Sequence, residues 1–131
     1  MSNVLLVQNN RIEGAGYLGD LLKEDGFNIH LVNGKYEKLP EKEYSLVVIL
    51  GAPESANDDL PYLREEQKLI KKSVEENTPV LGICLGSQLI AKTLGGATLK
   101  ILLSWKFFYN FIKFEIIFWE GWKIIKPEKI I

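Results

Sequence analysis

The segment from Pro79 to Gln88 contains the one cysteine of the chain and reads PVLGICLGSQ. Cys84 therefore lies between two glycines, Gly82 two residues before it and Gly86 two residues after it. An apolar run precedes the cysteine and a helix-forming run follows it, which is the pattern of a nucleophile elbow with Cys in place of Ser. Glycines are needed at these offsets because the sharp turn brings neighbouring backbone too close for side chains. We predict that the thiol stands above the carboxyl end of a sheet, at a helix N-terminus that favours the thiolate.

A buried structural role is the alternative for this cysteine, because unpaired cysteines are among the most buried residue types. The two glycines at the required offsets, placed between a strand and a helix, favour the nucleophile. Main-chain N–H groups near the elbow would then stabilise an oxyanion.

The longer segment 79–96, PVLGICLGSQLIAKTLGG, resembles the active-site signature of class I, triad-type glutamine amidotransferases, nearest the GMP synthase-like branch. The resemblance includes the GAPES loop at 51–55 and covers about three quarters of the chain. In this family a cysteine attacks the carboxamide of glutamine, and the ammonia passes to a synthetase partner or fused domain. The resemblance therefore implies a glutamine-hydrolysing enzyme that needs no cofactor and no metal.

The resemblance also implies roles for individual residues, carried over by position. Cys84 would be the nucleophile, and the backbone N–H groups of Leu85 and Ala52 would form the oxyanion hole. Gln88 and Gly51 would contact the substrate glutamine. Ala52 stands where the family usually has glycine, which keeps the N–H donor but adds a methyl group to the loop.

The rest of the family's catalytic triad is a His-x-Glu pair far downstream, in which the histidine is the general base and the glutamate orients it. The single histidine of this chain is His30, which precedes Cys84, and we assign it a structural or surface role. The resemblance thus implies a chain truncated after the nucleophile motif. We expect a poor or inactive glutaminase, because the loss of one triad member costs several orders of magnitude in rate.

The elements that must position the cysteine are predicted from the alternation of short apolar runs with helical periods. Strands are expected at 4–7, 27–32, 46–50 and 79–83, and helices at 14–25, 61–76 and 85–94. Unbroken apolar strands alternating with helices are typical of a parallel sheet covered on both faces. We predict an incomplete α/β fold of three layers, with a doubly wound, mostly parallel, flavodoxin- or Rossmann-like sheet.

Two local details follow from the helical segments. In 14–25 we expect Tyr17, Leu18, Leu21 and Leu22 to share the buried side, with Gly26 as the left-handed stop. The second helix should begin at Pro61, with the side chain of residue 58 or 59, both aspartates, as its cap.

The composition changes after residue 100. All three tryptophans and five of the six phenylalanines lie in 101–131. We predict a partial amidotransferase domain over 1–100 and a tail over 101–131 whose composition is typical of a frameshift product or a divergent terminus. Lys106, Lys113 and Glu115 interrupt its longest apolar run, which disfavours a membrane span.

A net charge of −1 gives no electrostatic reason to expect nucleic acid or an anionic membrane as a partner. A single cysteine cannot form an internal disulfide, so we expect a cytoplasmic protein.

Three other functions stay open at this point. Gly14-Ala-Gly-Tyr-Leu-Gly19 matches the G-x-G-x-x-G pattern of dinucleotide-binding folds, although several residues separate it from the first strand. A non-catalytic binding or regulatory module would fit the missing histidine. A thiol hydrolase of the intracellular-peptidase type is disfavoured, because Leu85 stands where such enzymes usually have histidine.

Overall fold

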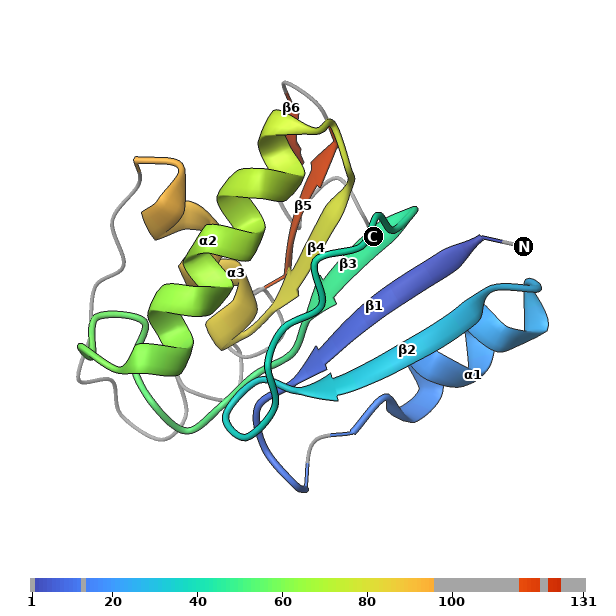
Figure 1. Cartoon of the computed structure of the whole chain (residues 1–131), viewed down its shortest axis with the longest axis horizontal. Coiled ribbons are helices and arrows are strands. Elements are labelled where there is room, and N and C mark those ends of the chain that lie inside the picture. Colours follow the sequence, from blue (N-terminus) through green and yellow to red (C-terminus); the bar gives the residue numbers. More distant parts are fainter. Residues whose placement is uncertain (1, 13, 96–115, 121–122, 126–131) are drawn as a thin grey trace, which may run out of the picture.

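The computed structural model describes residues 2–12, 14–95, 116–120 and 123–125 of the chain. A mixed six-stranded sheet forms its centre, in the order β2-β1-β3-β4-β5-β6 (Figure 1). The strands are β1 (Asn3–Gln8), β2 (Asn28–Asn33), β3 (Leu46–Ile49), β4 (Val80–Ile83), β5 (Ile116–Glu120) and β6 (Lys123–Ile125). The first four strands are parallel, and β5 and β6 continue the sheet in antiparallel pairing.

The helices are α1 (Gly16–Glu24), α2 (Pro61–Glu75) and α3 (Leu85–Thr93). α1 packs on one face of the sheet, whereas α2 and α3 pack on the other and share its larger core. This arrangement confirms the predicted three-layer, mostly parallel α/β fold.

The unbroken apolar sequence of β1 is explained by its burial on both faces of the sheet. Its four central side chains are fully buried, and they alternate between the two cores. Leu5 and Val7 face α2 and α3, while Val4 and Leu6 face α1. A strand in the middle of a parallel sheet has no solvent face, so no position is left for a polar residue.

The register of the parallel strands brings their carboxyl ends to one edge of the sheet. Val7 pairs with both Val32 and Ile49, and Ile49 pairs with Gly82. The chain segments that follow the strands therefore meet at this edge. Residues 9, 34–35, 50–56 and 84 all follow strand ends there.

The buried side of α1 differs from the prediction. Leu18 and Leu22 pack against the sheet, but the side chains of Tyr17 and Leu21 are exposed. These are two separate i,i+4 rows, turned from each other around the helix, and a short helix buries one of them. Gly26 ends the helix as predicted, with a φ of 86°.

The start of α2 also differs in part. Pro61 is its first residue, as predicted, but the N-cap is Leu60 and no side chain caps the helix. Asp58 instead accepts a hydrogen bond from the backbone N–H of Ser55. An aspartate that closes a local turn is no longer available as a cap.

The predicted tail over 101–131 is described only at β5 and β6, and its other residues, like Gly96 of the motif, lie outside the described residues. Within the described part of the chain, no helix has both the length and the apolar character needed to cross a bilayer.

Candidate active site

The cysteine lies where β4 ends and α3 begins. Cys84 is half-buried and is the only residue between Ile83, the last of the strand, and Leu85, the first of the helix. Its backbone has φ 53° and ψ −114°, a conformation that residues with a Cβ rarely adopt. Such a conformation costs on the order of 1–3 kcal/mol and persists only where the surroundings impose it.

The two flanking glycines supply that constraint. A Cβ on Gly86 would lie 2.1 Å from the carbonyl oxygen of Ile49, at the end of β3. A Cβ on Gly82 would lie 2.5 Å from the carbonyl carbon of Gly86 and 2.6 Å from the backbone nitrogen of Ser87. The obstacles are main-chain atoms, which cannot rotate away as a side chain can. The sequence pattern is thus explained by close backbone approach at both positions.

The first turn of α3 is fixed to the elbow by hydrogen bonds. The hydroxyl of Ser87, a buried residue, donates to the Cys84 carbonyl at 2.6 Å, and the backbone N–H of Gln88 donates to the same oxygen at 3.2 Å. Leu85 is the first residue of the helix, where main-chain N–H groups have no partner within the helix. The thiol therefore stands at the positive end of α3.

The GAPES loop leaves the neighbouring strand at the same edge. Since Ile49 pairs with Gly82, Gly51 and Cys84 each lie two residues beyond this pair. Gly51 is buried, and Ala52 is partly buried with its side chain against the core shared with α2 and α3. Gln88 is also partly buried, one helical turn after the cysteine. The fold thus gathers all the sequence-predicted site residues at the ends of β3 and β4.

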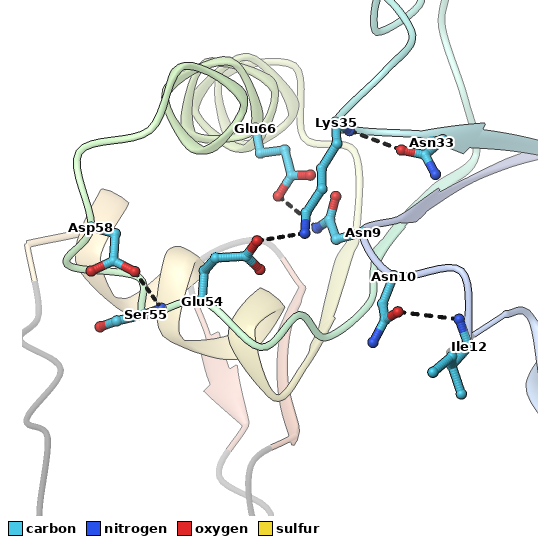
Figure 2. A network of polar contacts seen from close by, with 9 residues as sticks. All are labelled: Asn9, Asn10, Ile12, Asn33, Lys35, Glu54, Ser55, Asp58 and Glu66. Carbon is cyan, nitrogen blue, oxygen red and sulfur yellow. Dashed lines mark hydrogen bonds and ion pairs between the residues drawn. The ribbon is translucent and has the colours of Figure 1, made fainter.

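Three contacts tie this loop to the rest of the molecule. Lys35, which follows β2, donates to Glu54 at 2.5 Å in a partly buried ion pair (Figure 2). Ala56 is buried in the core, and Lys92 of α3 donates to its carbonyl at 2.9 Å. Burial raises the pKa of Glu54, but several smaller effects, led by the hydrogen bond from Lys35, together outweigh it, and the net pKa is lowered. The Glu54 carboxylate is therefore held as the charged partner of Lys35.

A buried polar pair lies beside this ion pair and was missed from the sequence. Asn9, directly after β1, donates through Nδ2 to Oε2 of Glu66 at 3.0 Å, and both residues are fully buried (Figure 2). A signal was present: Glu66 stands three residues after Leu63 and four before Ile70, inside the buried stripe of α2. A carboxyl group at such a position needs a specific partner.

Two other features of the sequence, the histidine and the G-x-G-x-x-G segment, differ from the elbow. The histidine lies on a distant strand, and only part of the glycine segment is tightly packed. His30 is in β2, which β1 and β3 separate from β4, and its Nδ1 is 2.5 Å from the hydroxyl of Tyr44. In the G-x-G-x-x-G segment, Gly19 is packed tightly, since a Cβ there would meet that of Ala15 at 2.6 Å. Gly16 has open space around it. Among the described residues, no group of three potential metal ligands comes together.

Comparison with known proteins identifies a family whose model matches most of this chain. The family model for class I glutamine amidotransferases matches residues 17–124, which include the loop and the elbow. The match continues past residue 100, where the composition changes.

Individual relatives cover parts of the same region. A glutamine amidotransferase-like protein of Acanthamoeba polyphaga mimivirus is 38% identical over 94 residues, 70% of this chain and 45% of that protein. A glutamine-hydrolyzing GMP synthase subunit of Sulfolobus acidocaldarius is 44% identical over 59 residues, 45% of this chain and 30% of that protein. The crystal structure of a glutamine amidotransferase from Thermotoga maritima has a TM-score of 0.67 and 38% identity, covering 72% of this chain and 43% of that one. The chain spans less than half the length of each of these relatives.

The elbow glycines should be intolerant of even one methyl group. We expect Gly86→Ala and Gly82→Ala each to lower the free energy of unfolding by about 2–3 kcal/mol, because main-chain atoms occupy the space of the new Cβ. Gly14→Ala is the matched control, since its Cβ would meet nothing closer than 3.8 Å. It should change the free energy by less than about 0.5 kcal/mol. Urea denaturation followed by circular dichroism measures all three, and equal effects would contradict the steric account.

Alanine is usually more stabilising than glycine within a folded chain. Because the backbone of Cys84 is strained, we expect the reverse at this position. We expect Cys84→Gly to be more stable than Cys84→Ala by about 1 kcal/mol, because glycine adopts a φ of 53° without a Cβ penalty. Both variants lose the thiol, so their difference isolates the backbone. At Ala91, within α3, the change to glycine should instead destabilise by about 0.5–1 kcal/mol. Denaturation midpoints of the three variants test this, and an alanine variant at 84 as stable as the glycine variant would contradict it.

Proposed function

The chain belongs to the class I glutamine amidotransferase family, and on this premise we propose that Cys84 is the nucleophile of a glutaminase site. The observation that carries the proposal is the half-buried cysteine with φ 53°, held at the start of α3 by two glycines that admit no side chain. Strained residues of this kind gather at active sites, where the strain serves to present a reactive atom.

The chemistry begins with the Cys84 thiolate attacking the side-chain amide carbon of glutamine. The amide oxygen becomes an oxyanion, and we assign its stabilisation to the backbone N–H groups of Leu85 and Ala52. Gln88 and Gly51 contact the bound glutamine. Collapse of the tetrahedral intermediate breaks the C–N bond and leaves a γ-glutamyl thioester on the cysteine. The departing nitrogen takes up a proton and leaves as ammonia.

Water completes the cycle by attacking the thioester, which gives glutamate and restores the thiol. Both the departure of ammonia and the attack of water need a group that exchanges protons. The 131 residues contain one histidine, His30, which lies in β2 and contacts Tyr44. We therefore propose that these residues by themselves form the thioester and turn over slowly.

The ammonia acceptor is proposed from the relatives. The similarity to a subunit of a glutamine-hydrolyzing GMP synthase supports a synthetase protein or domain as the partner that receives the ammonia. Such a partner would contact the carboxyl edge of the sheet, where the elbow opens.

Active-site labelling tests the nucleophile. We expect a chloroketone analogue of glutamine to add once to the chain by displacement of chloride from its carbon by the thiolate. The chain has a single cysteine, so the intact mass alone reports the reaction. Cys84→Ser should give no adduct, and excess glutamine should slow the labelling of the native chain. If iodoacetamide labels the thiol but the analogue reacts no faster and glutamine does not protect, the site is not a glutamine site.

A change at Gln88 should slow labelling by the glutamine analogue without changing the accessibility of the thiol. We expect Gln88→Ala to slow labelling by the glutamine analogue about tenfold or more, since one substrate hydrogen bond is worth about 1–2 kcal/mol. Labelling by iodoacetamide, which makes no such contact, should change less than about twofold. Gln67→Ala, a glutamine on α2 away from the elbow, is the matched control. Equal slowing of both reagents by the Gln88 change would point to a structural role.

A binding or regulatory module on the same fold is the second candidate, and the single histidine favours it. Glutamate release from glutamine discriminates the two. Release that is lost in Cys84→Ser supports the enzyme, whereas glutamine binding without release in the native chain supports the module.

A further inference from the structure

Four buried side-chain oxygens in and beside the GAPES loop have no hydrogen-bond partner among the described residues, on Asn9, Glu66, Glu54 and Tyr62. The oxygens of Asn9 and Glu66 belong to one buried pair. The pair of Asn9 and Glu66 makes one hydrogen bond, from Nδ2 to Oε2. Oδ1 of Asn9 and Oε1 of Glu66 have no partner in the part of the chain that the structure describes. Each such atom gives up its hydrogen bonds to water on burial, so leaving it unpaired is unfavourable.

The two oxygens lie close to each other. Each is 2.4 Å from the point that a Cβ on Gly34 would occupy, so they are separated by at most twice that distance. An ionised carboxylate offers only acceptors, so an ionised Glu66 has no hydrogen to donate to Oδ1 of Asn9. Rotating the Asn9 amide by half a turn does not help, because an oxygen would then oppose the other carboxylate oxygen. A proton on Glu66 turns one oxygen into a donor and gives a cyclic pair with two hydrogen bonds.

Burial, rather than the surrounding charges, favours the protonated form of Glu66. Lys35 follows β2 and is already paired with Glu54 of the GAPES loop at 2.5 Å. Its ammonium group also lies 5.4 Å from the centre of the Tyr62 ring on α2. An ionised Glu66 would be a second carboxylate beside a single lysine. Burial raises the pKa of Glu66 from its usual 4.5 to about 8, against the opposing effects of Asn9 and Lys35.

We propose that Glu66 is protonated and forms a neutral cyclic pair with Asn9, which leaves Lys35 to Glu54 and so positions the GAPES loop. The cyclic pair joins α2 to the end of β1, and the ion pair joins the loop to the turn after β2 (Figure 2). Glu66 is in this sense a positioning residue for the N–H group of Ala52, and this part rests on the proposed function. Loss of the proton would add a carboxylate that competes for Lys35 and would loosen the loop.

The pH dependence of unfolding tests the shared proton. A raised pKa means that the folded chain holds the proton over a range in which the unfolded chain has lost it, so this stabilisation is complete below about pH 4.5 and lost by about pH 8. The unfolding constant of the native chain, divided by that of Glu66→Gln, should therefore rise with pH over this range, by up to about tenfold per unit. Glutamine keeps both hydrogen bonds but has no proton to lose. Glu65→Gln, the exposed neighbour paired with Lys68, is the matched control and should give a flat ratio. A flat ratio for Glu66→Gln overturns the proposal.

Hydrogen exchange tests the positioning. At pH 6, Glu66→Ala should speed amide exchange in residues 51–56 at least about fivefold, and Glu66→Gln should restore native protection. In the native chain, exchange corrected for its intrinsic pH dependence should also quicken between pH 6 and 9, but not in Glu66→Gln. Unchanged protection in Glu66→Ala would exclude a role in holding the loop.

The effect of the loop on Cys84 is measured by the rate of labelling with the chloroketone analogue divided by the rate with iodoacetamide. The ratio should fall in Glu66→Ala and recover in Glu66→Gln, because only the analogue carries the amino-acid part of glutamine that would place its carbonyl oxygen in the oxyanion site. Absence of analogue labelling in every variant would refute the proposed function alone, since the unfolding and exchange measurements do not depend on it. A normal ratio in Glu66→Ala would refute the positioning role while leaving the glutaminase site intact.

Discussion

The main-chain contact on which the elbow depends lies where Gly86 of α3 meets the carbonyl of Ile49. A Cβ at Gly86 would be 2.1 Å from that oxygen, so the first turn of α3 is set against the end of β3 by its backbone. The chain must then pass from β4 into α3 through one residue. Cys84 takes a φ of 53° because no longer turn fits between these fixed elements.

The same strand also fixes the other half of the site. β3 supports α3 through Ile49 and then continues, two residues later, into Gly51 and Ala52 of the loop. The proposed nucleophile and the proposed oxyanion donor are therefore both positioned by one strand in the middle of the sheet. A site that depends on a few tenths of an ångström is best built on such an element, because a buried central strand moves less than any loop. The loop is held further on by Glu54 and Ala56, through side-chain and core contacts.

The parts of this fold that could be predicted are those determined by local sequence. The strands were recognisable because both faces of the sheet are covered, so β1 has no alternation of polar and apolar residues. The elbow was recognisable because the two glycines stand beside a single cysteine at fixed offsets. The buried side of α1 could not be recognised from the sequence, because both i,i+4 rows are apolar and only packing decides between them. The pair of Asn9 and Glu66 was missed for a related reason: its members are 57 residues apart, and neither has a local partner.

Two different kinds of interaction hold the two halves of the site, and they respond differently to conditions. The elbow is held by steric exclusion between main-chain atoms, which does not depend on pH or salt. The loop is held by a cluster that contains one lysine and two carboxyl groups, one of them buried with a pKa raised to about 8. A leucine in place of Glu66 would fill the space but leave the amide of Asn9 without a partner. A polar pair is directional, so it fixes the rotation of α2 relative to the end of β1 as an apolar contact would not. The pH response of the site, apart from the chemistry of the thiol, should therefore originate at the loop and its buried carboxyl group rather than at the elbow.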